Sequence, residues 1–319
     1  MTTIAGLHAP RSKDLLRITD LSRDEVGALF TTARSLRADR NAFAGALTGR
    51  AIILLFEKAS LRTRVTFEVG PARLGAHAMY FEHTAQRIGQ RESIKDYARN
   101  LERWVDAIVA RVYAQSTLDG LAANCDVPVV NALSDAEHPC QALADLFTLE
   151  NHLAAKGRSL TGAHVAYVGD GNNVCNSLML LCAMLGVHFT FVGPAAHAPR
   201  PEFASRAGDL ASSTGSRVHV SSSLDALASV DAVYTDTWVS MGDEAQAAAK
   251  QRALSAYQVN ARAMSIAGPN AVFMHCLPAH RGEEVTDGVI DSPASIVYEQ
   301  AESRMHVQNA LLLHMLRGE

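Results

Sequence analysis

The sequence predicts an α/β protein with two doubly wound parallel-sheet domains, each an α/β/α sandwich, joined by linking helices. Short apolar runs recur along the chain, and each is followed by a longer segment with helical periodicity. Strand–helix alternation of this kind implies parallel strands with right-handed crossovers. The alternation occurs in two separate series, and 319 residues are more than one typical domain holds.

The first series carries four apolar runs that we expect to be strands, with a helix between each pair. The strands are Ala51–Phe56, Ala76–Tyr80, Ala107–Arg111 and Val127–Val130. The helices are Arg62–Leu74, Ser93–Trp104 and Thr117–Asn124. A segment of good helix formers, Glu137–Lys156, then leads to the second series and is expected to be a linking helix.

The second series carries five expected strands and two expected helices. The strands are His164–Val168, His188–Val192, Arg217–Val220, Asp231–Thr235 and Val272–His275, and the helices are Asn173–Leu185 and Arg200–Ser212. Two further helices, Leu21–Ala38 and Glu299–Leu316, fall outside both series, and the second is expected to pack on the first domain. The expected domains are residues 1–136 completed by 299–319, and residues 137–298.

Composition narrows the class of protein. The chain is 48% hydrophobic and 19% charged, so it can bury a core. A net charge of −4 without a basic stripe argues against nucleic acid as a partner. No apolar run approaches the ~20 residues of a membrane helix. Five scattered cysteines and an N-terminus without a signal-peptide pattern are typical of a reduced, cytoplasmic protein, with four cysteines expected as core residues.

Ligands in open parallel sheets bind beyond the carboxyl ends of the strands. After the first strand the chain reads Ser60-Leu61-Arg62-Thr63-Arg64. Ser60 can cap the next helix and leave the following three amides for an anion, to which Arg62 adds a guanidinium suited to phosphate. Arg62 and Arg64 lie two residues apart and point to different sides of the helix, so one can face the anion and the other is expected to form a structural ion pair. An ordinary capped helix with solvated arginines is the alternative.

Three other polar residues follow strands of the first series. Arg111 ends the third strand, where it would add a second cation unless it is a surface arginine. His138 and Gln141 lie three residues apart at the start of the linking helix, so they share one face. The histidine could polarise a carbonyl oxygen and the glutamine could hold an amide, with a helix-capping histidine as the alternative.

In the second series, GDGNNVCN (Gly169–Asn176) follows a strand and opens a helix. A dinucleotide site would need a third glycine where Val174 stands, and an acidic residue after the next strand. Neither is present, so Asn172 and Asn173 are expected to offer amides to a polar ligand such as an amino-acid head group.

Two later segments also follow strands. In DTWVSM, Asp236 could accept from an ammonium, Ser240 and the Met241 backbone could hold a carboxylate, and Trp238 is expected in the core. In HCLPAHR, His275, Cys276 and His280 are close together, but a zinc site would need a fourth ligand. A nucleophilic Cys276 would need an oxyanion loop, which is not recognisable before it. Both possibilities remain alternatives.

Taken together and in order, seven stretches resemble ornithine carbamoyltransferase. They are FEKASLRTR, Arg111, HPCQ, GDGNN, DTWVSMG, HCLPAHRG and AESR, the last of which contains Arg304. Aspartate carbamoyltransferase shares the Ser-x-Arg-Thr-Arg and HPxQ types but lacks DTWxSMG and HCLPA. The resemblance implies a carbamoyl-phosphate domain followed by an L-ornithine domain, a cytoplasmic homotrimer or multiple of trimers with sites at subunit contacts, and no cofactor or metal.

The resemblance also assigns residues to ligands. It gives the phosphate to Ser60, the Leu61 amide, Arg62 and Thr63, and the carbamoyl group to Arg111, His138 and Gln141. It gives ornithine to Asn173, Asp236, Ser240 and Met241. Cys276, the Leu277 backbone and Arg304 are assigned to the surroundings of the reacting atoms, as further carbamoyl-phosphate contacts.

This sequence departs from the family pattern at two positions. Leu61 stands where the family usually has threonine, so a hydroxyl is lost while the backbone amide remains. Relatives that use N-acetylated or N-succinylated ornithine also vary there. Arg87 stands where a glutamine is usual, in a loop that family members use across the trimer contact, and no role is transferred to it.

The reaction that the resemblance implies is carbamoyl phosphate plus L-ornithine giving L-citrulline plus phosphate, in arginine biosynthesis, by direct amine attack without a covalent intermediate. An alkylammonium has a pKa of about 10.4, so the site must provide the neutral amine, and Asp236 and Cys276 are both candidates for taking the proton. Thr63, Arg111 and His138 would stabilise the oxyanion. The alternatives are a carbamoyltransferase for N-acetylornithine or putrescine, a nicotinamide-dependent dehydrogenase, and a non-catalytic scaffold.

Overall fold

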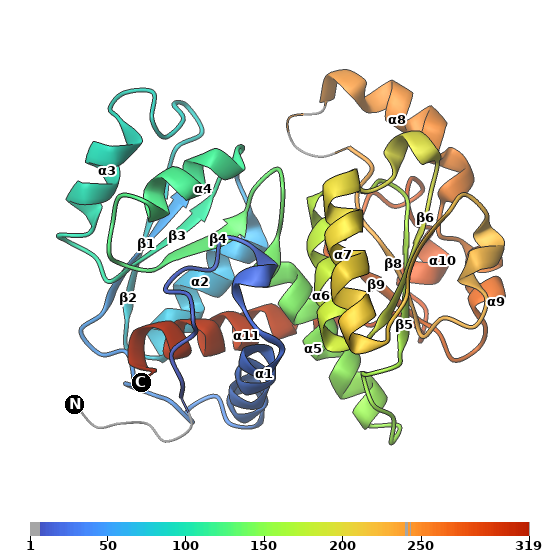
Figure 1. The fold of residues 1–319 in the computed structure, drawn as a ribbon, viewed down its shortest axis with the longest axis horizontal. Coiled ribbons are helices and arrows are strands. Elements are labelled where there is room, and N and C mark those ends of the chain that lie inside the picture. The colour runs from blue at the N-terminus through green and yellow to red at the C-terminus, as the bar shows by residue number, and fades with distance from the viewer. Residues whose placement is uncertain (1–6, 240–241, 243, 319) are drawn as a thin grey trace. The chain divides into compact units, whose positions relative to one another are not determined.

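A computed structural model describes residues 7–239, 242 and 244–318 (Figure 1). The chain divides into two compact units. Unit 1 comprises the residues up to Leu143 and those from Glu302 onward, and unit 2 comprises Ala144–Ala301. The division falls inside two helices, α5 (Pro139–Ala154) and α11 (Val297–Arg317). The boundary expected from sequence, 136/137, lies just before the first of these helices.

Unit 1 contains a four-stranded parallel sheet in the order β2-β1-β3-β4. Its strands are β1 (Ala51–Phe56), β2 (His77–Glu82), β3 (Ala107–Arg111) and β4 (Val129–Leu133). Its other elements are η1 (Ile18–Asp20), α1 (Arg23–Ala38), α2 (Leu61–Arg73), α3 (Ile94–Leu101) and α4 (Gln115–Ala122). The strand order reverses between β1 and β3, whose last residues, Phe56 and Arg111, are paired in register. This is where an open parallel sheet binds its ligand.

Helices cover both faces of the unit 1 sheet, and β1 and β3 are buried along nearly their whole length. One face presents Ile53, Leu55 and Ile108 to α3 and α4, and Leu118 and Leu121 of α4 belong to the same core. Figure 1 shows these two helices on that face and α2 on the other. At Gly70, α2 approaches the C-terminal helix so closely that a Cβ atom would lie 2.2 Å from Asn309 Oδ1. A larger residue at this position would therefore force the Asn309 side chain to move.

Unit 2 contains a five-stranded parallel sheet in the order β7-β6-β5-β8-β9. Its strands are β5 (His164–Val168), β6 (His188–Val192), β7 (Val218–Ser221), β8 (Ala232–Thr235) and β9 (Val272–His275). Its α-helices are α6 (Asn173–Leu185), α7 (Pro201–Thr214), α8 (Ala247–Leu254), α9 (Ala261–Ala267) and α10 (Asp287–Ile290). Its short 3-10 helices are η2 (Ala195–His197), η3 (Leu224–Leu227), η4 (Glu244–Gln246) and η5 (Ser255–Tyr257). The two doubly wound sheets confirm the expected fold class.

The strand order of unit 2 reverses between β5 and β8, where Val168 pairs with Thr235. The loops beginning at Gly169 and Asp236 are therefore neighbours at the carboxyl edge of the sheet. Three α-helices of this unit, α8, α9 and α10, were missed by the sequence analysis, because α8 lies in an alanine-rich tract, α9 has only seven residues and α10 only four. Among the described residues, no helix is both long and apolar enough to cross a bilayer.

Candidate active site

The turn that follows β1 is built around the start of α2. Ser60 caps this helix as expected, and its Oγ accepts from the Thr63 amide at 3.3 Å. The Thr63 amide is therefore already bonded within the protein, and the expectation that it stays available for an anion is wrong. The Leu61 side chain is 74% exposed, so its contribution to this turn is the backbone amide at the first helical position.

Two arginines follow the cap, and the structure separates their environments. Arg64 pairs with Glu68 at 3.2 Å and its guanidinium lies 3.8 Å from the centre of the Tyr80 ring. The expected structural ion pair is thereby confirmed for Arg64. Arg62 is half-buried and occupies the second position of α2. It therefore remains the arginine that we predict to bind the phosphate.

A buried carboxylate holds the neighbouring loops in place. Glu57, the residue after β1, accepts from the amides of Ile88 and Tyr113, each at 2.9 Å. Its own amide donates to the Arg111 carbonyl at 2.9 Å, which ties the ends of β1 and β3 together. Arg111 itself is only 8% exposed, which excludes the alternative of a surface arginine. Sequence analysis missed Glu57, because a charged residue after an apolar run resembles an ordinary strand end.

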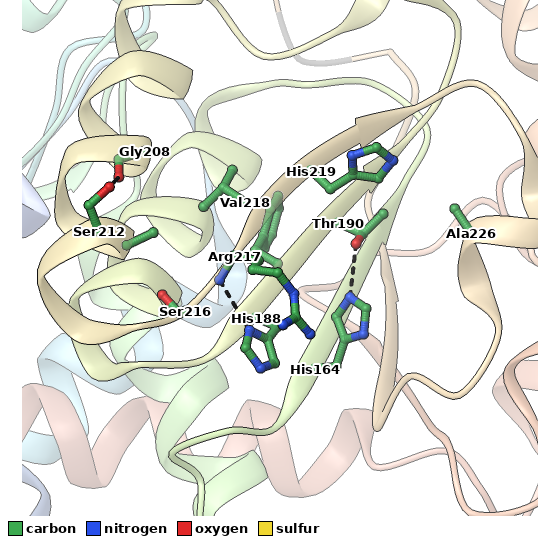
Figure 2. A pocket seen from close by; sticks show the side chains of 12 residues that line it. His164, His188, Thr190, Gly208, Ser212, Ser216, Arg217, Val218, His219 and Ala226 are labelled. Carbon is green, nitrogen blue, oxygen red and sulfur yellow. Dashed lines mark hydrogen bonds between the residues drawn. The ribbon is translucent and has the colours of Figure 1, made fainter.

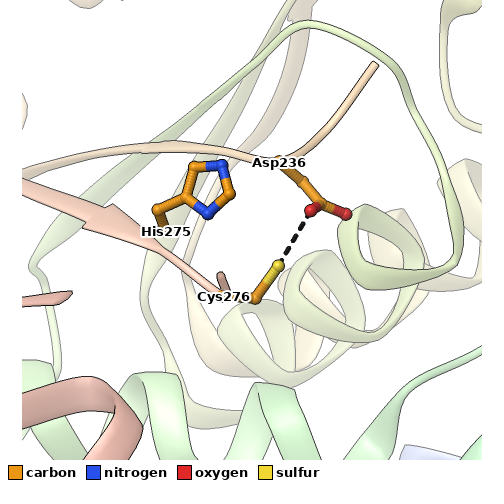
Figure 3. Close-up of side chains that lie close together, drawn as sticks. All are labelled: Asp236, His275 and Cys276. Atoms are coloured by element: carbon orange, nitrogen blue, oxygen red, sulfur yellow. Dashed lines mark hydrogen bonds between the residues drawn. The ribbon is translucent and has the colours of Figure 1, made fainter. Parts of the chain in front are cut away.

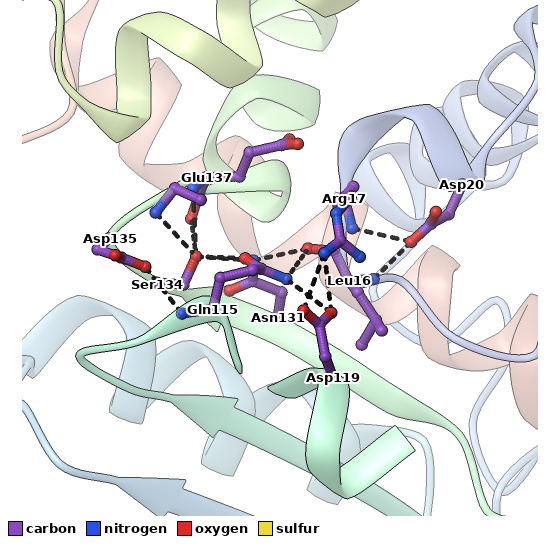
Figure 4. A network of polar contacts seen from close by, with 10 residues as sticks. Leu16, Arg17, Asp20, Gln115, Asp119, Asn131, Ser134, Asp135 and Glu137 are labelled. Atoms are coloured by element: carbon purple, nitrogen blue, oxygen red, sulfur yellow. Dashed lines mark hydrogen bonds and ion pairs between the residues drawn. The ribbon is translucent and has the colours of Figure 1, made fainter. Parts of the chain in front are cut away.

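The loop after β4 is positioned by the polar network in Figure 4. Ser134 Oγ donates to Gln115 Oε1 at 2.6 Å and accepts from the amides of Ala136 and Glu137, each at 3.2 Å. Asn131 Nδ2 donates to the Leu16 carbonyl at 2.8 Å. These contacts fix the short segment that delivers His138 to the start of α5.

His138 is buried in unit 1 beside two guanidinium groups. Burial, and then the positive charges of Arg304 and Arg111, hold the pKa of this imidazole well below its usual 6.5. The ring is therefore neutral near pH 7, so one nitrogen carries a proton that it can donate to a carbonyl oxygen. Cys140, two residues later, is also buried, and burial raises the pKa of its thiol to about 12, which makes it an inert core residue.

Arg304 is buried among the residues that the sequence analysis assigned to carbamoyl phosphate. Its Nη1 donates to Gln141 Oε1 and its Nη2 donates to Thr63 Oγ1 at 3.1 Å. With the Gln308 amide turned so that its oxygen faces the guanidinium, Gln308 Oε1 accepts from Nη2 at 2.9 Å and from Nε at 3.0 Å. The guanidinium thus links α2, α5 and α11 within unit 1.

In unit 2, donors converge on the Asp236 carboxylate at the end of β8. Asn172 Nδ2 donates to Oδ2 at 2.8 Å, and the Thr237 amide donates to Oδ1 at 2.7 Å. The Cys276 thiol also donates to Oδ1, with Sγ at 2.8 Å (Figure 3). The structure therefore brings together Asp236 and Cys276, the two candidates for handling the substrate proton.

The geometry around Cys276 does not fit either alternative for HCLPAHR. A thiol that donates to a carboxylate lacks the electropositive surroundings that activate a nucleophilic cysteine. The donor atoms of Asp236, His275 and Cys276 lie within 4.8 Å of one another, as in a metal site. However, His275 Nδ1 accepts from the Leu277 amide at 2.8 Å and Nε2 contacts the buried Glu284 at 3.2 Å, so both ring nitrogens are already bonded. This set therefore lacks the ligands of a zinc site.

Leu277 adopts a left-handed backbone conformation with φ of +57°, which a leucine rarely adopts. Its amide is turned onto His275, so its carbonyl is the backbone group left for a ligand. Non-glycine residues in this region persist where the surrounding structure requires them, often at functional sites. The contact between the Leu277 backbone and a substrate stays a prediction.

The glycines of GDGNN serve loop packing. A Cβ atom on Gly171 would lie 2.4 Å from the Pro199 nitrogen, and the Gly171 amide donates to the His197 carbonyl at 2.8 Å. The loop therefore packs against the segment after β6. Asp170 strengthens this packing by pairing with His197 and with Lys250 of α8, each at 2.9 Å. Asn172 caps α6, and Asn173 occupies its first position, half-buried.

Two predicted site residues, Ser240 and Met241, lie outside the residues that the structure describes. Trp238, just before them, is buried as expected. The other four cysteines, Cys125, Cys140, Cys175 and Cys182, are buried, which confirms the expectation that they are core residues.

A cavity of about 630 Å³ lies at the amino ends of the unit 2 strands, at the opposite edge of the sheet from Asp236 (Figure 2). It is lined by His164 and His188, the first residues of β5 and β6, and by Arg217 and His219. These residues are at the amino ends of the strands, whereas open parallel sheets bind ligands at the carboxyl ends. The cavity is therefore separate from the candidate active site.

Comparison with known proteins agrees with this geometry. The family model of the aspartate/ornithine carbamoyltransferase carbamoyl-P binding domain matches residues 13–151, and that of the Asp/Orn binding domain matches residues 161–315. The ornithine carbamoyltransferase of Shewanella oneidensis is 46% identical over 301 residues, covering 94% of this chain and 98% of the relative. That of Hyperthermus butylicus is 46% identical over 311 residues, covering 95% and 97%.

Among solved structures, ornithine carbamoyltransferase from Pyrococcus furiosus matches with a TM-score of 0.91 and 41% identity, covering 98% of each chain. The resemblance found in the sequence motifs is thereby confirmed over nearly the whole chain. The protein belongs to the aspartate/ornithine carbamoyltransferase family.

Proposed function

We propose that the protein is an ornithine carbamoyltransferase that converts carbamoyl phosphate and L-ornithine into L-citrulline and phosphate. The observation that carries the proposal is the contrast between two sets of residues. Cations and a neutral imidazole gather after β1, β3 and β4, and a carboxylate bonded to an amide and a thiol follows β8. These sets suit a phosphorylated carbonyl compound and an alkylammonium, respectively.

Unit 1 supplies the groups for carbamoyl phosphate. The Ser60 hydroxyl, the Leu61 amide, Arg62 and Thr63 hold the phosphate at the start of α2, where the helix dipole favours an anion. Arg111 and neutral His138 donate to the carbamoyl oxygen and stabilise the negative charge that grows there during attack. Gln141 binds the carbamoyl amide, and Arg304 holds Gln141 and Thr63 in place as well as lying beside the ligand.

Unit 2 supplies the groups for ornithine. Asp236 attracts the side-chain ammonium, and Asn173, Ser240 and the Met241 backbone hold the amino-acid end. The amine must lose a proton before it attacks the carbamoyl carbon, and the Asp236 carboxylate can accept it directly or through the Cys276 thiol, which passes its own proton to Asp236 as it receives one. The nitrogen then forms a bond to that carbon while the bond from carbon to the phosphate oxygen breaks, and the second proton of the nitrogen leaves with the phosphate, so no enzyme group becomes covalently attached.

An exposed apolar surface of unit 1 supports the proposal of a homotrimer. Leu61, Val65 and Val69 recur every four residues along α2 and are exposed, and Met79 and Phe81 are exposed on the edge strand β2. Apolar surfaces of this kind mark interfaces between chains. Light scattering coupled to gel filtration should give about three times the chain mass, or a multiple of it. We further propose a cytoplasmic enzyme of arginine biosynthesis, in keeping with five free cysteines.

The test of the reaction is an assay for ureido products with carbamoyl phosphate and, in parallel, ornithine, N-acetylornithine, putrescine and aspartate. We expect citrulline from ornithine and little product from the other three amines. The amine that is carbamoylated with the highest kcat/KM is the acceptor substrate of the enzyme. Preference for N-acetylornithine or putrescine would contradict the proposed acceptor while leaving the reaction class intact.

A further inference from the structure

Two tyrosines form a matched pair next to the candidate ornithine residues. Tyr167 on β5 and Tyr234 on β8 are paired in register, both are fully buried, and their rings stack with centroids 5.3 Å apart and planes at 15°. Burial is the main cause that raises the pKa of both phenols well above 10.0, so both remain neutral. The two side chains therefore differ mainly in what their hydroxyl groups contact.

The Tyr167 hydroxyl has a defined partner. It donates to Asn172 Oδ1 at 3.0 Å. The Tyr234 hydroxyl has no hydrogen-bond partner among the residues that the structure describes. Burying a phenol costs free energy unless its hydroxyl is bonded, so the Tyr167 contact is the favourable one of the pair.

The hydrogen bond from Tyr167 helps to fix the orientation of the Asn172 amide. Asn172 Oδ1 also accepts from the amides of Val174 at 3.0 Å and Cys175 at 3.2 Å. With three donors on its oxygen, the amide cannot turn over without losing all of them. Its Nδ2 is consequently directed at Asp236 Oδ2, 2.8 Å away.

This arrangement determines how Asp236 can meet an amine. One carboxylate oxygen is bonded to Asn172, and the other to the Thr237 amide and the Cys276 thiol. A carboxylate held from both sides keeps a fixed direction for its remaining lone pairs. If the Asn172 amide changed its orientation, the Asp236 carboxylate would therefore lose a bond that holds it. The direction from which it accepts a proton or hydrogen bond from the substrate amine would then change.

We propose that Tyr167 is a positioning residue for amine binding, acting through Asn172 on Asp236; this rests on the proposed role of Asp236 in binding ornithine. Tyr167 does not reach the substrate in this role. It keeps the Asn172 amide in the orientation that aligns the carboxylate with the side-chain amine. Tyr234, with the same ring and burial, has no such role.

The test compares Tyr167→Phe with Tyr234→Phe, which remove one hydroxyl each from stacked, equally buried rings. We expect Y167F to lower kcat/KM for ornithine about three- to tenfold, as for the loss of one neutral hydrogen bond, with the Kd of carbamoyl phosphate unchanged. Y234F should change both quantities less than about twofold, since it removes a hydroxyl that has no partner among the described residues. Melting temperatures of both variants separate loss of fold from loss of alignment.

A double-mutant cycle with Asn172→Ala then tests the path. In the N172A background, Y167F should cause no further loss, because the group through which it acts is absent. Equal kinetics for Y167F and Y234F in an active enzyme, or additive losses in the cycle, would overturn the positioning role. A wild-type enzyme that forms no citrulline would instead overturn the proposed function, so the two failures are distinguishable.

Discussion

The candidate site residues of unit 1 and those of unit 2 differ in the charge that they present to a ligand. In unit 1, Arg111, His138 and Arg304 are buried, and the positive field of two arginines keeps the histidine neutral. In unit 2, Asp236 and Cys276 are only partly buried and are held by neutral donors. A phosphorylated ligand calls for fixed positive charge, whereas an ammonium that must become an amine calls for one carboxylate and groups that can move a proton.

The difference in charge indicates how the binding of two substrates can be divided between two sheets of the same kind. In both units some of these residues lie at the ends of the two strands where the strand order reverses, Arg111 at β3 and Asp236 after β8, so the backbone plan is shared. What differs is the side chain placed after each strand. Variants of one set should therefore affect one substrate and leave the other unaffected. Asp236→Asn and Arg62→Lys test this separation, and His138→Asn and Leu61→Thr refine the account of the unit 1 set, in order from the largest expected effect to the smallest.

Asp236→Asn should give the largest loss. Removing the carboxylate that pairs with the ammonium should lower kcat/KM for ornithine at least about a hundredfold, in the range for truncating one partner of a buried charge pair. The Kd of carbamoyl phosphate, measured by calorimetry, should stay within about twofold. Asp231→Asn is the matched control, because Asp231 lies at the amino end of the same strand and pairs with Arg158 at 2.6 Å. Equal losses for both substrates in D236N would contradict the separation.

Arg62→Lys tests the other set. Lysine keeps the charge but loses the planar fork, so we expect the Kd of carbamoyl phosphate to rise about ten- to a hundredfold while the fold is kept. Arg64→Lys, two residues away, replaces a guanidinium that pairs with Glu68 and should leave this Kd within about twofold. An unchanged affinity in R62K would remove Arg62 from the phosphate site.

His138→Asn tests the low pKa of the histidine through stability. Because folding lowers this pKa below 6.5, the unfolded chain takes up a proton below that pH while the folded chain does not. The free energy of unfolding should therefore fall as pH falls below 6.5, by at most about 1.4 kcal/mol per pH unit from this group. Above pH 6.5 the group contributes no slope.

Urea unfolding of wild type and H138N from pH 5 to pH 8 measures this contribution as the difference between the two curves. The variant should show the shallower loss of stability on the acid side. Parallel curves would mean that His138 takes up its proton equally in the folded and unfolded chains, which would contradict the lowered pKa inferred from its burial.

Leu61→Thr should have the smallest effect. The residue contributes its backbone amide, and its side chain is exposed, so restoring the usual threonine should change the Kd of carbamoyl phosphate less than about threefold. Leu61→Pro removes the amide hydrogen at a helix position that accepts proline, after a Ser60 whose φ of −160° and ψ of 115° are compatible with it. L61P should therefore weaken binding clearly more than L61T, and the reverse order would exclude the amide.

Much of this molecule could be predicted from sequence. Hydrophobic periodicity placed β1, β3, β5, β6 and β9 at their observed bounds. Local sequence reasoning also found the Ser60 cap and an ion pair for one of the two arginines, which the structure identifies as Arg64, because a helix cap and an i,i+4 ion pair are contacts between near neighbours in the chain. Residues that act at a strand end or a helix start are visible in this way, since the local pattern marks the position.

Contacts between distant parts of the chain could not be predicted. Arg304 and Thr63 are 241 residues apart, and Gly171 is required by its close approach to Pro199 rather than by a nucleotide. Glu57 resembled an ordinary strand end, and only its observed partners show that it holds neighbouring loops. Asn172 was expected to offer its amide to a ligand, whereas in the structure that amide is bonded to the Asp236 carboxylate.

From the sequence alone we could predict the alternation of strands and helices, the chemical type of each group after a strand, and the family. Three properties depend on the tertiary structure: which of these groups are in contact, whether His138 stays neutral, and which of the two stacked tyrosines has a bonded hydroxyl. The physical reason is that periodicity and capping depend on residues within one turn or strand. Side-chain partners, by contrast, depend on the order of the strands in each sheet, which no local pattern specifies.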